Sequence, residues 1–187
     1  MSLLPSRNHR HNKAFSLPER LINGQSVGDV AKMKFGLSTM SDSGCEVIAV
    51  YNALLLSGIP QPLPDIARYM ERFRVLGGFW GTNFLALGRC LRHFGLPAKR
   101  VRRRKKLLAG LEAGRICLMV YWTRRRFLSP VHTVCIFMRE AGEITVCNQY
   151  NNCARVLHEP AEKFLANRLI FGYITEEITG GESPRAV

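Results

Sequence analysis

The sequence predicts an α+β domain in which helices come first and an antiparallel sheet follows. In the first half of the chain, apolar residues recur at helical spacing. In the second half they gather in short runs typical of strands. Because the two kinds of segment are not interleaved, an antiparallel sheet is favoured over a parallel one. The 187 residues are 47% hydrophobic, which is enough to bury the core of one domain.

Four segments of the first half are predicted to be helical. Their expected ranges are 45–57, 63–78, 82–95 and 105–114. The first is apolar nearly all round, which is typical of a buried central helix. The second has Pro64 at its start and Gly77 and Gly78 at its end, and Thr82 or Asn83 caps the third.

Five segments of the second half are predicted to be strands. Their expected ranges are 115–122, 131–139, 143–150, 154–158 and 168–176. Residues 140–143 join two of them as a tight hairpin. The domain is expected over residues 21–178. Residues 1–20 and 179–187 are polar and lack periodicity, so we expect a mobile N-terminal segment and a disordered tail.

Charge and cysteine content narrow the function classes. The formal net charge of +13 predicts attraction to anions but does not bear on the fold. No apolar stretch is long enough for a membrane span, and the N-terminus does not read as a secretion signal, so we expect a cytoplasmic protein with reduced cysteines. The six cysteines form no CxxC pair, and no metal or other cofactor is expected.

Cys45 lies at the start of the first predicted helix. Ser43 and Glu46 fit the Ser-x-x-Glu capping box, which would make Ser43 the N-cap and place the thiol in the first turn. Free backbone N–H groups and the helix dipole lower the pKa of a thiol at this position. Cys45 is therefore either a packing residue or a nucleophile.

Two polar residues of the predicted sheet could serve such a nucleophile. His132 opens the strand 131–139, so its ring can point at a helix end as a base, although a partly buried structural histidine is the alternative. Asn148 follows on the neighbouring strand, where an amide oxygen could accept the ring N–H and hold the required tautomer. Asn148 could otherwise be a turn former at a strand end.

The order Cys, His, Asn resembles that of the papain-like cysteine peptidases. Within them the chain is most similar to the stand-alone or transporter-linked bacterial peptidases that trim double-glycine leader peptides from bacteriocins. Three segments carry the resemblance: SGCEVIAVYNALLLSG, GTNFLALGRCLRHFGLPAKRV and HTVCIFMREAGEITVCNQYNN. It implies a papain-like fold, with N-terminal helices and a buried nucleophile helix packed on the C-terminal sheet. It also implies Cys45 as nucleophile, His132 as general base and then acid, and Asn148 as the orienting residue of a peptide hydrolase.

Two positions depart from the pattern of this group. Papain-like enzymes usually carry a glutamine about six residues before the nucleophile, where its amide stabilises the oxyanion. Thr39 stands there in this chain, so Thr39 and Ser38 are the candidate oxyanion donors. Glu46 follows the nucleophile where leader peptidases usually have glycine, and its negative charge opposes thiolate formation.

Basic residues gather in two places. Residues 99–106 carry seven positive charges, and Arg124, Arg125 and Arg126 add three more shortly before His132. Both groups fit a solvated surface, whereas the second is also a candidate binding site for an acidic peptide or protein substrate. Two alternatives to the enzyme stay open: a papain-like fold that only binds a peptide, and a nucleic-acid-binding protein whose affinity falls steeply with salt. Nucleic acid is the weaker partner prediction, because no zinc finger or aromatic RNA-binding strand motif accompanies the charge. A transporter partner follows from the resemblance alone.

Overall fold

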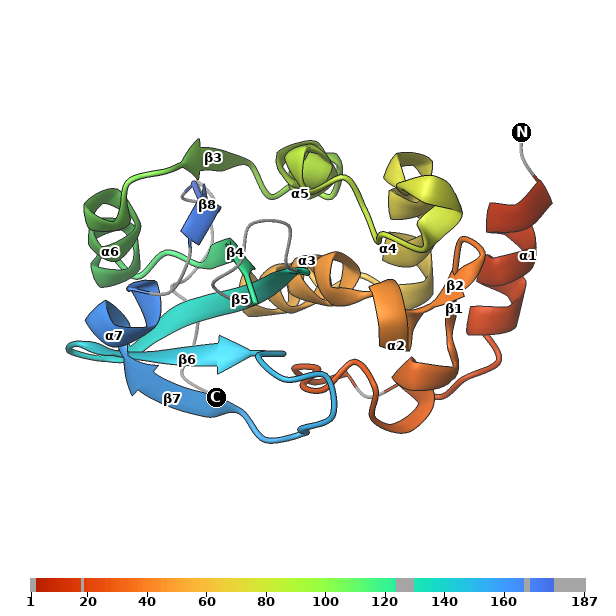
Figure 1. The fold of residues 1–187 in the computed structure, drawn as a ribbon, viewed down its shortest axis with the longest axis horizontal. Coiled ribbons are helices and arrows are strands. Elements are labelled where there is room, and N and C mark those ends of the chain that lie inside the picture. The colour runs from red at the N-terminus through yellow and green to blue at the C-terminus, as the bar shows by residue number, and fades with distance from the viewer. Residues whose placement is uncertain (1–2, 18, 124–129, 167–168, 177–187) are drawn as a thin grey trace.

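A six-stranded antiparallel sheet forms one half of the protein (Figure 1). The computed structural model describes residues 3–17, 19–123, 130–166 and 169–176. The strand order is β3-β8-β4-β5-β6-β7, and every neighbouring pair is antiparallel. The strands are Ala98–Val101 (β3), Cys117–Trp122 (β4), Val131–Glu140 (β5), Glu143–Cys147 (β6), Leu157–Pro160 (β7) and Leu169–Thr175 (β8). The predicted α+β class and antiparallel sheet are confirmed.

Helices make up most of the other half. They are Leu3–Asn12 (α1), Met40–Ser43 (α2), Cys45–Leu56 (α3), Leu63–Met70 (α4) and Leu87–His93 (α5), with Arg104–Glu112 (α6) and Ala161–Leu165 (α7) beside the sheet. Lys34–Phe35 (β1) and Ser38–Thr39 (β2) pair as a small separate hairpin. Short 3-10 turns fill the links at Gly28–Lys32, Glu71–Phe73, Leu76–Gly78 and Phe84–Ala86. None of the helices in the described ranges is long and apolar enough to cross a membrane.

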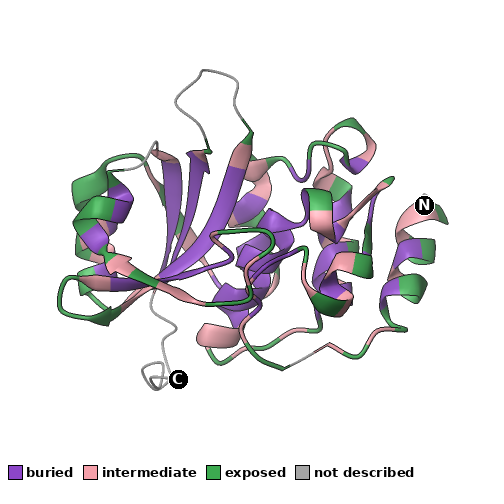
Figure 2. Ribbon diagram, turned by 60° about the horizontal axis from the view of Figure 1, so that its bottom comes forward, coloured by how far each residue is buried: buried purple, intermediate pink, exposed green. Residues whose placement is uncertain are grey.

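The sheet is covered on both faces, and each face has its own apolar core. Leu118 and Cys135 belong to the core shared with α3, α4 and α5. Met119 and Val134 alternate with them and pack with α6 and α7 on the opposite face. In Figure 2 the central strands and α3 are buried, whereas the outer helices keep an exposed side. Burial on both faces explains why these strands are apolar without interruption.

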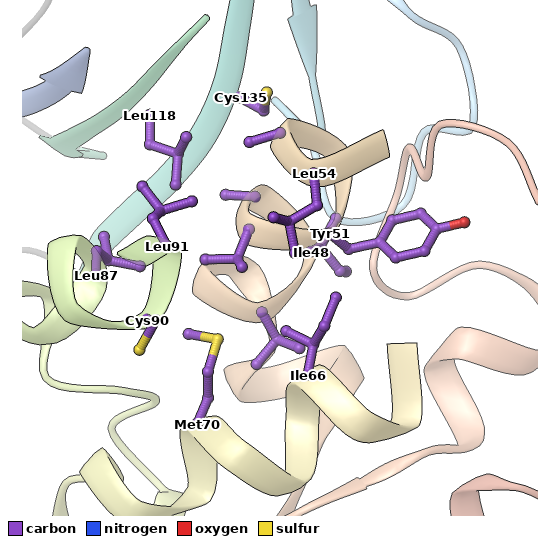
Figure 3. Close-up of a cluster of buried hydrophobic side chains, with 14 of the residues drawn as sticks. Ile48, Tyr51, Leu54, Ile66, Met70, Leu87, Cys90, Leu91, Leu118 and Cys135 are labelled. Atoms are coloured by element: carbon purple, nitrogen blue, oxygen red, sulfur yellow. The ribbon is translucent and has the colours of Figure 1, made fainter. Parts of the chain in front are cut away.

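Helix α3 is the centre of the larger core. Its residues Cys45 to Leu54 are all buried, so it has no polar face to solvent over that length. Figure 3 shows Ile48 and Leu54 among side chains of α4, α5 and the sheet, while the ring of Tyr51 points away from this cluster. The near-continuous apolar sequence therefore follows from contact with neighbours on every side.

Several helices are shorter than the sequence indicates. The predicted helix 63–78 ends as α4 at Met70 and continues as two 3-10 turns, the first followed by extended backbone at Arg74 and the second containing Gly77 at a φ of 71°. The predicted helix 82–95 begins as a 3-10 turn capped by the Asn83 side chain and becomes α-helical only at Leu87. The predicted strand 154–158 is shifted to β7, Leu157–Pro160, where it pairs with β6.

The N-terminal region differs from the mobile segment that we expected over 1–20. Residues 3–12 form α1, which contacts β1 and α4 through polar groups. The Asn8 amide lies 2.8 Å from the carbonyl O of Gly36 and 2.8 Å from Oε1 of Glu71. Asn12 exchanges two hydrogen bonds with the backbone of Lys34. Because amides rather than apolar residues hold this helix, hydrophobic periodicity gave no sign of it. The expected tail 179–187 lies outside the described residues.

Candidate active site

The nucleophile candidate is the first residue of α3. Gly44 is the N-cap, and the preceding residues form the short helix α2 instead of an extended lead-in. The predicted capping box is therefore wrong: Ser43 closes α2, and its hydroxyl lies 3.2 Å from Oγ of Ser38. A side chain at position 44 could not fit, since an added Cβ would lie 2.5 Å from the carbonyl O of Met40. This tight α2–α3 junction places Cys45 at the helix start.

His132, the second residue of β5, has its ring held by a backbone carbonyl. Its Nε2 lies 2.6 Å from the carbonyl O of Asn148. Because a carbonyl only accepts, Nε2 carries the ring proton, and the other nitrogen, Nδ1, keeps a lone pair. His132 is 7% exposed, and its ring can act as a base through Nδ1.

Asn148 contacts His132, but with its backbone and not with the side-chain amide that we expected to orient the ring. The residue follows β6 in the left-handed region, with φ of +63°, which asparagine tolerates better than most residues. Its Oδ1 accepts from the Gln25 backbone N–H at 3.0 Å, and its Nδ2 donates to Gln25 Oε1 at 3.2 Å. The side chain thus fixes the local chain, whose carbonyl then points at His132.

Cys45 and His132 line one pocket, although they are 87 positions apart in the sequence. The pocket has a volume of about 320 Å³, and Gln25 and Asp42 belong to its wall. Residues 149–152, which follow β6, form another part of it. The pocket therefore joins the start of α3, the start of β5 and the chain after β6.

Gln25 is a site residue that the sequence reasoning missed. It lies 20 positions before Cys45, outside the window where a glutamine was sought. It is 2% exposed, and its Nε2 donates to the carbonyl O of Ser41 at 2.8 Å. One signal could have revealed this segment: Asn52 lies in the middle of an apolar helix, where a buried amide needs partners. It finds them in the backbone N–H and carbonyl of Ile22, three residues before Gln25.

The predicted oxyanion donors lie outside the pocket wall, and the predicted substrate-binding arginines lie outside the described residues. Thr39 caps α2, with Oγ1 2.8 Å from Oδ2 of Asp42, and Ser38 contacts Ser43. Of the described residues, those that line the pocket include neither Thr39 nor Ser38, so neither is placed as an oxyanion donor. Arg124, Arg125 and Arg126 lie outside the described residues.

The electrostatics at the thiol differ from those expected of a helix start. Burial, followed by the charge of Glu46, raises the pKa of Cys45 well above its ordinary value. Burial also raises the pKa of Glu46 to about 7, and it lowers the pKa of His132. The Thr133 backbone donates to the sulfur and opposes the shift of the Cys45 pKa, but it does not reverse it. At rest the pair is therefore a neutral thiol and a neutral imidazole.

The fold is similar to that of solved peptidase domains. The peptidase domain of Streptococcus ComA, a bi-functional ABC transporter involved in a quorum-sensing pathway, has a TM-score of 0.51 at 9% identity, over 76% of this chain and 97% of that one. A double-glycine motif protease from an AMS/PCAT transporter, in complex with the leader peptide, has a TM-score of 0.49 at 16% identity, over 71% and 84%. No protein-family model and no curated protein matches the sequence. The chain therefore shares the fold of the ComA domain, as the resemblance to papain-like proteins implied.

Proposed function

We propose that this protein is a cysteine peptidase that cleaves a peptide bond with Cys45 as nucleophile and His132 as general base. The observation that carries the proposal is the shared pocket, which brings a helix-start thiol and a histidine with a free Nδ1 lone pair together. The papain-like fold supports it independently of these residues. Nucleophile, base and a group that holds the base in one tautomer are the parts that covalent hydrolysis needs.

The reaction begins with transfer of the Cys45 proton to Nδ1 of His132. The sulfur forms a bond to the peptide carbonyl carbon, and the resulting oxyanion needs donors. The amide of Gln25 has a second N–H besides the one bonded to Ser41, and the backbone N–H of Cys45 is among the first of a helix, which lack intrahelical partners. Collapse breaks the C–N bond, and the amine leaves with the proton from His132. Water then hydrolyses the thioester by the same base.

An exposed apolar surface beside the site supports a peptide substrate with apolar side chains. Leu76, Phe79 and Trp80 are more than 60% exposed, and so is Leu37 on the adjoining β1–β2 turn. The carbonyl O of Phe79 lies 3.4 Å from the Ser43 hydroxyl, so this surface adjoins the α2–α3 junction. Contiguous exposed apolar side chains on a small domain mark interaction sites. The resemblance to double-glycine leader peptidases implies a more specific substrate, a leader peptide that is cleaved after two glycines.

The three arginines at 124–126 are proposed to bind acidic parts of the substrate. Thr123 and Pro130, which flank the segment 124–129, both line the pocket. The backbone N–H of Thr123 donates to the carbonyl O of Pro130 at 2.9 Å, so the two ends of the segment meet there. Reversing the three charges should raise KM for acidic peptides more than for neutral ones, and equal changes would remove this role.

Peptide-library cleavage read by mass spectrometry tests the enzymatic function. Wild type is expected to produce fragments at one class of bond, whereas Cys45→Ala and His132→Ala should produce none. Cys153→Ser is the matched control, because Cys153 is a partly exposed cysteine outside the pocket wall. Identical fragment profiles for wild type and Cys45→Ala would rule out the enzyme. If wild type and Cys45→Ala both bind a peptide and neither cleaves it, the protein is instead a papain-like fold that binds peptides without catalysis.

A further inference from the structure

A buried carboxylate contacts the nucleophile. Cys45 Sγ donates a hydrogen bond to Oε2 of Glu46 at 3.3 Å, and Glu46 is 4% exposed. Burying a carboxylate is costly unless other groups compensate for the lost water. The mechanism proposed above makes no use of Glu46, so its position against the reacting sulfur calls for a separate explanation.

The residues around Glu46 leave space for its carboxylate and donate a hydrogen bond to it. Gly81 has φ of +67°, and an added Cβ there would lie 2.9 Å from Glu46 Oε2, so glycine allows the close approach. The backbone N–H of Thr82 donates to the carboxylate. Among the described residues the Thr82 hydroxyl, also buried, has no hydrogen-bond partner. The loop before α5 thus encloses the carboxylate tightly and supplies a donor to it.

The pocket wall that Cys45 and His132 share does not include Glu46 among its described residues. A thiol proton bonded to Glu46 is not bonded to His132, the base that must take it. We propose that Glu46 is a positioning residue that holds Cys45 as a thiol and keeps the nucleophile at rest while the carboxylate is charged. This inference rests on the proposed role of Cys45.

The electrostatics of the contact give the direction of the effect. A thiolate at Cys45 would lie against a carboxylate, and two like charges at hydrogen-bond distance in a buried site repel strongly. When Glu46 is protonated, its O–H donates to the thiolate instead, so the same contact then stabilises the reactive form. The groups that face the pair are the backbone N–H groups of Glu46, Thr82 and Thr133 and the phenol of Tyr121, with His132 and Asp42 on the pocket side. A pKa of about 7 for Glu46 places this change of charge near neutral pH.

The test is the rate of Cys45 alkylation by iodoacetamide as a function of pH, in a Cys153→Ser background so that the other thiols are buried ones. Glu46→Gln should raise the rate at pH 7.5 about tenfold or more, since lowering a thiol pKa by one unit multiplies the thiolate fraction by about ten. Glu46→Ala, which lacks the carboxylate altogether, should behave alike. Glu71→Gln is the matched control: Glu71 is equally buried but bonds to Asn8 and Gly36, and it should leave the rate unchanged.

Two outcomes would overturn the inference. Slower alkylation in Glu46→Gln would mean that Glu46 acts as a base for the thiol. If both Glu46 variants keep the wild-type alkylation rate and the same midpoint of the pH profile, Glu46 has a structural role only. His132→Ala, alone and combined with Glu46→Gln, separates this inference from the proposed function. If His132 is not the base for Cys45, Glu46→Gln still accelerates alkylation, and His132→Ala changes the rate neither in wild type nor in Glu46→Gln. If His132 is the base but Glu46 does not restrain the thiol, His132→Ala slows alkylation and Glu46→Gln does not accelerate it.

Discussion

Asn148 illustrates how a correctly chosen residue can act through an unexpected atom. We predicted that its side-chain amide would orient His132, and the structure has the backbone carbonyl in contact with the ring at 2.6 Å. The side chain bonds to Gln25 instead. A sequence names the side chain but not the backbone angle, and the positive φ at Asn148 turns the carbonyl toward the ring.

Asn148→Gly separates the two roles. Glycine adopts a positive φ without strain and keeps the carbonyl, so peptide cleavage should stay within about tenfold of wild type. Asn148→Ala should be less active and less stable than Asn148→Gly, because alanine in the left-handed region costs about 1–2 kcal/mol that glycine avoids. The measurement is kcat/KM for both variants beside His132→Ala. Loss in Asn148→Gly as large as in His132→Ala would show that the carbonyl alone is not sufficient and that the side chain is needed to orient the ring.

Glu46 should make the stability of the protein depend on pH. Its pKa is raised from 4.5 to about 7 in the folded protein, so between these values the folded state holds a proton that the unfolded chain has lost. The resulting stabilisation is complete below about pH 4.5 and is lost as the pH rises through 7. Relative to Glu46→Gln, wild type should therefore lose up to about 3 kcal/mol of unfolding free energy between pH 4.5 and 8. Urea unfolding at several pH values measures this difference, and parallel curves for the two proteins would contradict it.

At the scale of elements, α3 serves both as the centre of the core and as the support of the site. Its first residue is the nucleophile candidate, and its eighth, Asn52, holds the segment that carries Gln25. The Asn52 amide exchanges two hydrogen bonds with the backbone of Ile22, at 2.8 and 2.9 Å. One helix thus sets the relative positions of Cys45 and Gln25.

Asn52→Leu should destabilise the protein and disturb the site together. It leaves a buried N–H and a buried carbonyl of Ile22 without partners, and each such group costs about 1–3 kcal/mol. Chemical denaturation should show a loss of at least 2 kcal/mol, and cleavage should fall further than in Asn152→Ala, an exposed control in the pocket loop. Unchanged cleavage in a folded Asn52→Leu protein would mean that Gln25 needs no such support.

Over the whole molecule, the sequence predicted structure best where apolar periodicity coincides with residues that can take part in catalysis. The antiparallel sheet, the buried helix at Cys45 and the pocket with His132 could be predicted because each depends on a local pattern or on the order of residues along the chain. Helix α1, Gln25 and the Asn148 carbonyl could not, since amide-to-backbone bonds over distances of 16 to 123 positions hold them. Such bonds leave no periodic signal.

The basic residues at 99–106 also belong to this scale. All seven are exposed, on the edge strand β3, on α6 and between them, and Lys99 pairs with Glu176 at 3.3 Å. Charged side chains on an edge strand prevent its open hydrogen-bonding groups from pairing with another sheet. This role accounts for the charge on β3 without a nucleic-acid partner.

The central claim is that His132 activates Cys45 inside the pocket. The most direct measurement is intact-protein mass spectrometry after reaction with a peptidyl chloromethyl ketone, followed by mapping of the modified residue. We expect one adduct per molecule, on Cys45, that is lost in His132→Ala and is suppressed by a peptide that the enzyme cleaves. Modification spread over several cysteines, or equal modification of Cys45 with and without His132, would contradict it.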